Sequence, residues 1–144
     1  MGDISRRSLI VAGVWSAPVV AVAMAVPAAA ASGETAGTVN EIYRYQQFAN
    51  SVNWTWNATN DTSQSAVLTV VFDLGPFTFG GWLTSAWSRS VNTYVSNAAV
   101  APSAQVGNCT IVLQAPSGTS GTVTATVMAE GAQPRVQAFA ITIP

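Results

Sequence analysis

Alternation of apolar and polar residues is the feature that most constrains the fold of this chain. From Ser51 to Thr59, small polar residues separate four apolar ones, which are Val52, Trp54, Trp56 and Ala58. Side chains of a β-strand point to its two faces in turn, whereas an amphipathic helix repeats about every 3.6 residues. The segment is therefore predicted to be a strand that buries one face.

Further strands are predicted on both sides of this segment. Ala66 to Leu74 follows a cluster of turn-forming residues and is apolar on both faces, so it is expected to form a hairpin with 51–59 or to lie beside it. Gly80 and Gly81, in the aromatic segment that follows, indicate a bulge or a loop close to another backbone. The other predicted strands are residues 42–48, as an edge strand rather than a short helix, 91–96, 108–114 and a terminal hairpin of 122–129 with 135–143.

About seven short strands separated by turns predict one all-β domain, an antiparallel β-sandwich of the immunoglobulin-like kind. From Ser51 to Pro144, the order of an alternating strand, an Asn-Asp-Thr turn, an apolar strand and a terminal hairpin is similar to the Ig-like repeats of bacterial surface proteins. The resemblance implies a two-sheet sandwich. A shared fold does not by itself imply a ligand.

The N-terminus has the pattern of an export signal. Ser5 to Ile10 resembles the twin-arginine export signal of bacteria, in which Arg6 and Arg7 are followed by one free position and two apolar residues. The next residue, Val11, departs from the lysine that is common in this family. No charged residue follows until Glu34, and the apolar stretch ends in alanines, of which Ala29 and Ala31 suit signal peptidase. The resemblance implies export with cleavage after Ala31.

Two alternatives remain for this segment. The arginine pair is also compatible with the general secretory route, and residues 9–31 are long enough for a retained anchor, which needs about 20 apolar residues. The mild Ala/Val composition and two prolines favour cleavage. The predicted division is a signal peptide with an apolar helix at 1–31, a flexible leader at 32–40 and the sandwich at 41–144. The protein is expected in the cell envelope or outside the cell, meeting the membrane only through the uncleaved signal.

Charge excludes one class of partner. After Ala31 the only basic residues are three arginines, and the chain has no lysine. Binding to nucleic-acid phosphates needs a basic stripe, which is absent, so no nucleic-acid partner is predicted.

The composition also argues against catalysis. The chain has no histidine, which removes the commonest general base and the usual triads, and without lysine there is no Schiff-base chemistry.

The single cysteine, Cys109, alternates with Ile111 and Leu113 and is predicted to face the core, the alternative being a reactive or intermolecular thiol. No nucleotide-binding fingerprint is present. The chain is therefore predicted to be no enzyme and to carry no cofactor.

One turn contains potential calcium ligands. Asp61 could act with Asn57 and Asn60 at the end of the alternating strand. The same residues also suit an ordinary Asx turn, which is the favoured interpretation. No metal site is predicted.

Aromatic residues are the binding candidates. Trp54 and Trp56 share the apolar face and are predicted to be core, whereas Trp82, Trp87 and Tyr94 are candidates for an exposed ligand-binding surface, because aromatic rings can stack on sugars. The leading prediction is an exported, non-enzymatic envelope or extracellular protein that acts by protein or surface interaction. The alternative is a carbohydrate-binding module. The expected partners are the export machinery and an envelope protein or polysaccharide.

Overall fold

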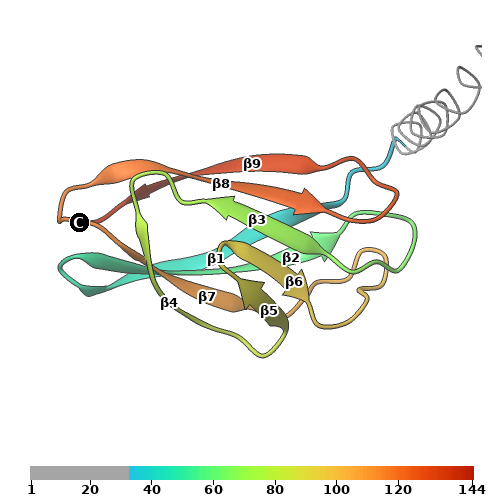
Figure 1. Ribbon diagram of the computed structural model, residues 1–144, viewed down its shortest axis with the longest axis horizontal. Helices are drawn as coiled ribbons and strands as arrows, with labels where there is room; N and C mark the ends of the chain where they lie inside the picture. The colour runs from blue at the N-terminus through green and yellow to red at the C-terminus, as the bar shows by residue number, and fades with distance from the viewer. Residues whose placement is uncertain (1–32) are drawn as a thin grey trace, which may run out of the picture. The chain divides into compact units, whose positions relative to one another are not determined.

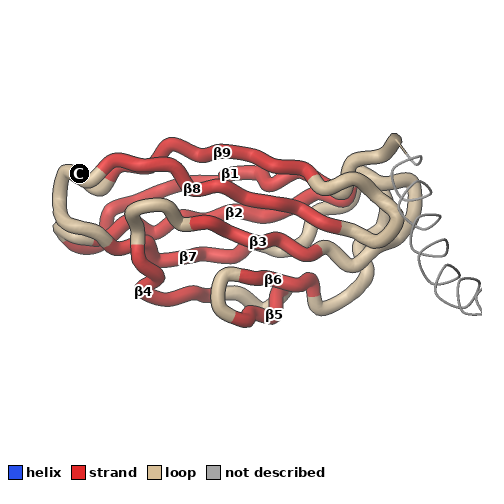
Figure 2. The backbone as a smooth tube through the Cα atoms, turned by 45° about the horizontal axis from the view of Figure 1, so that its top comes forward, coloured by secondary structure: helices blue, strands red, loops and turns tan. Residues whose placement is uncertain are grey.

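The computed structural model describes residues 33–144, which contain β-strands and no helix (Figures 1 and 2). No helical segment in this range could therefore meet the length and hydropathy of a membrane crossing. The strands are β1 (Gly37–Phe48), β2 (Ser51–Asn60), β3 (Thr69–Asp73), β4 (Thr78–Leu83), β5 (Trp87–Ser90), β6 (Thr93–Ser96), β7 (Cys109–Gln114), β8 (Ser120–Met128) and β9 (Arg135–Thr142). The predicted signal helix lies outside the described residues.

The strands form two antiparallel sheets, which confirms the predicted all-β sandwich. The first sheet has the order β1-β2-β7-β4, and the second has the order β5-β6-β3-β8-β9 (Figure 1). This makes nine strands within residues 33–144, compared with about seven expected. The additional strands come from the segment between residues 78 and 90, whose glycines and polar residues obscure the alternation.

Strand β2 lies at the centre of the first sheet and supplies much of the core. It pairs with β1 on one side and with β7 on the other. Trp54 and Trp56 are fully buried, as predicted, and so is Cys109, which lies opposite Trp56 on β7. Both tryptophans contact Phe72 of β3, so rings from the two sheets meet in one core. Residues 34–144 form a compact unit around this core.

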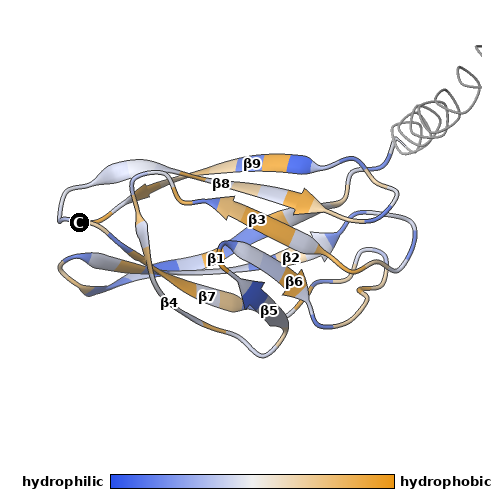
Figure 3. Ribbon diagram, in the orientation of Figure 1, coloured by the Kyte–Doolittle hydropathy of each residue, from blue (hydrophilic) through white to orange (hydrophobic). Residues whose placement is uncertain are grey.

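The apolar strand β3 belongs to a different sheet from β2, contrary to the predicted pairing. It pairs with β6 and β8, and the residues between its two polar ends are hydrophobic (Figure 3). The hairpin partner of β2 is instead the edge strand β1, joined through Ala49 and Asn50. Only Val70 and Phe72 of β3 are buried, and Val71 between them is partly buried. The apolar composition of a strand shows that it lies in the core but does not show which sheet it joins. The predicted terminal hairpin is confirmed as β8 and β9.

The ordered domain starts before the predicted boundary at residue 41. Ala36 and Val39 are buried, and Gly37–Asn40 belong to β1. The Gly, Ser and Thr residues of the segment before this boundary, with one acidic residue, suggested a flexible leader. The pairing of this segment with residues 57–60 of β2 makes it part of the sheet instead.

The predicted bulge in the glycine-rich segment is confirmed. The register of β4 against β7 shifts between Phe79 and Gly81. A Cβ atom at Gly80 would lie 2.6 Å from the side-chain carbonyl carbon of Gln114. A larger residue at this position would require the Gln114 side chain to move.

Candidate functional site

Two of the three predicted ligand-binding aromatics are core residues. Trp87 and Tyr94 are 2% and 1% exposed, and their rings pack within 5.0 and 5.5 Å of the Trp56 ring. The indole nitrogen of Trp87 donates a hydrogen bond to the carbonyl oxygen of Gly107 at 2.8 Å. The predicted exposure of Trp87 and Tyr94 is therefore wrong. Strands β5 and β6 direct both side chains into the core, where they pack against the Trp56 ring.

Burial also fixes the protonation of Tyr94. It raises the pKa of Tyr94 to about 12, although a hydrogen bond with Arg89 acts in the opposite direction. The hydroxyl is therefore neutral at physiological pH.

The third predicted residue, Trp82, lies at the rim of the sandwich. It is 40% exposed, and its ring makes an edge contact with Tyr94 at 6.1 Å. Nearby, the guanidinium carbon of Arg89 lies 3.4 Å from the ring centroid of Phe79. These contacts connect β4 of the first sheet with β5 and β6 of the second sheet. Trp82 therefore has no exposed aromatic neighbour from the predicted set.

The most exposed aromatic residues lie instead on β1, at positions for which no site was predicted. Tyr43, Tyr45 and Phe48 are 51%, 48% and 64% exposed. Tyr43 and Tyr45 lie opposite Thr55 and Asn53 of β2, which alternate with the core tryptophans. Both tyrosines therefore point to the outer face of the first sheet, away from the second sheet. Their rings are 6.1 Å apart and inclined by 28°.

The outer face beneath these tyrosines consists of uncharged polar side chains that bond one another. The Asn40 amide donates to Asn57 and Thr59, both at 2.9 Å, and the hydroxyls of Thr55 and Thr110 lie 2.7 Å apart. Although β2 lies in a sheet with one face outward, its polar residues are buried as well. Side chains from β1 and β7 cover them, so the outer face presents tyrosine and amide groups without charge.

Two polar atoms on this outer face lack partners. The Ser51 hydroxyl and the Asn53 side-chain oxygen are buried and form no hydrogen bond with any residue in the range 33–144. Asn53 does donate through its amide nitrogen to Gln47 at 2.9 Å. An unsatisfied buried group costs about 1–3 kcal/mol, so both atoms reduce the stability of this end of the β1–β2 hairpin.

The turn after β2 is an Asx turn, as the favoured interpretation predicted. The Asn60 side-chain oxygen accepts bonds from the backbone nitrogen and the hydroxyl of Thr62, at 2.9 and 2.8 Å. Asp61 lies 3.6 Å from Arg135 and accepts a bond from Thr38. Within residues 33–144, no three His, Cys, Asp or Glu side chains gather closely enough to hold a metal ion.

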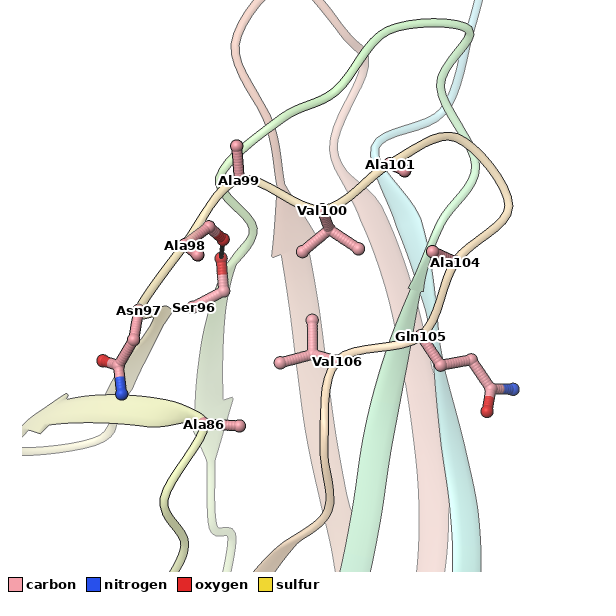
Figure 4. Close-up of a pocket in the computed structure, with 10 residues that line it drawn as sticks. All are labelled: Ala86, Ser96, Asn97, Ala98, Ala99, Val100, Ala101, Ala104, Gln105 and Val106. Atoms are coloured by element: carbon pink, nitrogen blue, oxygen red, sulfur yellow. Dashed lines mark hydrogen bonds between the residues drawn. The ribbon is translucent and has the colours of Figure 1, made fainter.

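Two hollows in the surface of residues 33–144 are lined mainly by uncharged side chains. One, of about 350 Å³, is lined by small side chains around Ala99 and Val100 of the loop after β6 (Figure 4). Another, of about 460 Å³, includes Glu34 and Glu130 among otherwise uncharged residues.

Cys109 is buried and unpaired, as predicted. Burial raises the pKa of its thiol to about 12, so the nucleophilic thiolate is disfavoured. The remaining predicted residues, Arg6, Arg7, Ala29 and Ala31, lie outside the described range.

Comparisons with known proteins give little further information. No protein-family model matches the sequence, and neither does any curated protein. Among solved structures, a DUF4466 family protein from Parabacteroides merdae is similar, with 12% sequence identity and a TM-score of 0.39. The match covers 76% of this chain and 44% of that protein, so the chain spans less than half of its length.

Proposed function

We propose that this is an exported envelope or extracellular β-sandwich protein without catalytic activity, which acts by binding a protein or a cell surface. The twin-arginine pattern at Arg6 and Arg7 supports export. The lack of histidine and lysine argues against the usual enzyme chemistries.

The observation that carries this proposal is the exposed aromatic strand β1. Tyr43, Tyr45 and Phe48 all lie opposite outward-facing residues of β2, and all three are about half exposed or more. Tyrosine and phenylalanine are enriched in protein interfaces, where charged residues are depleted. Exposed apolar groups that gather in one place commonly mark interaction sites.

The test is retention of envelope material by immobilised residues 32–144. The variant Y43S/Y45S removes the two rings, and Leu83→Ser on β4 is the matched control, because Leu83 is 77% exposed but lies on the opposite edge of the same sheet. Isolated envelope proteins and insoluble cell wall are applied separately. We expect Y43S/Y45S to lose retention and L83S to keep it. Equal retention by both variants would contradict the proposed surface.

One observation favours the alternative function, a carbohydrate-binding module. Trp87 and Tyr94 are unavailable to a ligand, but the near-parallel rings of Tyr43 and Tyr45 lie above a face of amides and hydroxyls. Affinity electrophoresis through gels that contain neutral polysaccharides separates the two proposals. Retardation that Y43S/Y45S abolishes would favour the carbohydrate-binding module, and unchanged mobility would leave the protein-binding proposal.

A further inference from the structure

Strand β1 diverges from β9 along its length. Directly before the first residue of β1, the backbone nitrogen of Ala36 donates to the Gln133 carbonyl at 2.9 Å. Further on, the backbone of Val39 is bridged by the side chain of Gln137. Further still, Arg44 reaches the carbonyl oxygen of Ala140 at 2.6 Å. Because β1 ends the order of its sheet, its second half has no strand partner on this side among the described residues.

The register of β1 shows which backbone groups face this open side. The partners of Val39, Glu41 and Arg44 are Ala58, Trp56 and Trp54, which are alternate residues of β2. Val39 directs its N–H and C=O away from β2, because both bond the Gln137 amide. In an antiparallel ladder alternate residues have equivalent orientations, so Glu41 and Arg44 also direct theirs outward. The bulge between Glu41 and Tyr43 places these two outward residues three positions apart.

The two outward residues carry opposite charges. Glu41 and Arg44 form an ion pair at 2.7 Å, and about a third of each side chain is exposed. If a second β1 strand lies antiparallel to the first, one register places Glu41 opposite Arg44 of the second copy, twice by symmetry. Another register places the two Arg44 residues opposite each other and is disfavoured by like charge. The charges therefore select one two-fold arrangement.

The apolar residues between these charges fit the same arrangement. Ile42 and Tyr43 are 44% and 51% exposed, and in this register each lies opposite the other in the second copy. Tyr45 is 48% exposed and lies opposite Asn40 of the second copy, on the outer face of both strands. Pairs of an aromatic and a β-branched residue across antiparallel strands are stabilising. A two-fold contact must be self-complementary, and this segment meets that condition.

We propose that β1 pairs with β1 of a second copy of this chain, in the register that places Glu41 opposite Arg44. The two four-stranded sheets then form one continuous sheet across a two-fold axis. This inference rests on the proposed role of β1 as the contact surface and names the partner. Exposed edge strands are prone to aggregate, and pairing in one register would satisfy the open backbone groups of β1 in a defined way.

The first experiment is sedimentation of residues 32–144 over a range of concentrations. The parent is expected to dimerise reversibly. Glu41→Arg and Arg44→Glu each place like charges together, so each variant alone should weaken the dimer by about tenfold or more. An equimolar mixture of E41R and R44E should recover the dimer, because each mismatched charge then faces an opposite one. The internal Glu41–Arg44 pair is broken in both variants, so recovery cannot come from repair within one chain.

A parent that stays monomeric at the highest soluble concentration, or a mixture that stays monomeric while both variants are folded, would overturn the proposal. Circular dichroism of each variant checks folding. If either variant unfolds, oxidation of a mixture of Ile42→Cys and Tyr43→Cys replaces the charge test. Opposed residues on antiparallel strands have Cα atoms about 4.5–5.5 Å apart, which is within disulfide range. A cross-linked dimer from the mixture supports the register, and its absence contradicts it.

The failures of the two proposals are distinguishable. If the protein is monomeric but Y43S/Y45S still loses retention on envelope material, the second-copy inference fails and the proposed function stands. If the dimer forms as described but no envelope material is retained, the proposed function fails.

Discussion

The side-chain amide of Gln137 bonds the backbone of Val39 through both of its polar atoms. The Val39 nitrogen donates to the Gln137 oxygen at 2.7 Å, and the Gln137 nitrogen donates to the Val39 carbonyl at 3.1 Å. Gln137 thus takes the place of a neighbouring strand where β1 separates from β9. Val39 is only 2% exposed, so water cannot readily replace these bonds.

Gln137→Leu should therefore destabilise the domain. It leaves a buried N–H and a buried C=O unpaired, at a cost of about 1–3 kcal/mol for each group. Urea unfolding monitored by tryptophan fluorescence measures the change. Gln133, which precedes β9, is an unsuitable control because its backbone bonds Glu34 and Ala36. Thr142→Leu at the far end of β9 is preferable, because the Thr142 side chain is exposed and, among the described residues, bonds only the exposed hydroxyl of Ser120. Equal stability of Q137L and the parent would show that the amide bridge contributes nothing.

The two core tryptophans should differ in their response to phenylalanine. Both are fully buried, but the Trp54 nitrogen donates to the Glu41 carboxylate at 2.6 Å, whereas the Trp56 nitrogen has no partner. Trp54→Phe loses this bond, and Trp56→Phe removes an unsatisfied donor. We expect Trp54→Phe to cost about 1 kcal/mol more in the free energy of unfolding. The reverse order in urea melts would contradict the hydrogen bond.

Substitution by alanine should lower the stability of the domain far more at Trp87 than at Trp82. Trp87→Ala empties a core site, which typically costs about 3–5 kcal/mol, a large part of the about 5–15 kcal/mol that holds such a domain together. Trp82→Ala should cost much less, because this side chain is 40% exposed. Thermal melts give both values. A W82A variant that melts as low as W87A would assign Trp82 to the core and exclude it from ligand binding.

Alkaline pH should destabilise the domain through two buried groups. Burial raises the pKa of Cys109 from 9.0 to about 12, and that of Tyr94 from 10.0 to about 12. Because both groups ionise first in the unfolded chain, stability is complete below about pH 9 and falls as pH rises towards 12. Melting temperatures across this range should fall less steeply in Cys109→Ala than in the parent. A parallel fall would mean that Cys109 is not the group responsible.

The same buried thiol should resist modification. Native protein at neutral pH is expected to react with a thiol reagent far more slowly than protein unfolded in urea. Rapid labelling of the native protein would contradict the burial of Cys109.

Export should depend on the arginine pair. Replacing Arg6 and Arg7 with lysine keeps the charge but removes the pattern that the twin-arginine receptor recognises, so the precursor should accumulate in the cytoplasm. Immunoblots of cell fractions measure this distribution. Normal export of the lysine variant would assign the protein to the general secretory route.

Local pattern determined much of the fold. The alternation from Val52 to Ala58 identified a strand and its buried face, and the same period placed Cys109 in the core. The period of a strand depends only on its own backbone, which is why one sequence suffices to find it. The terminal hairpin was found for the same reason.

Only the tertiary structure decided which sheet each strand joins and which aromatic residues stay exposed. Trp87 and Tyr94 are covered because β5 and β6 turn them towards Trp56, whereas Tyr43 and Tyr45 are exposed because they point to the outer face of the first sheet, away from the second sheet. The exposed fraction of a ring depends on which distant segments lie over it. The sequence around a ring does not contain that information, so the alternation that identified the core could not locate the candidate surface.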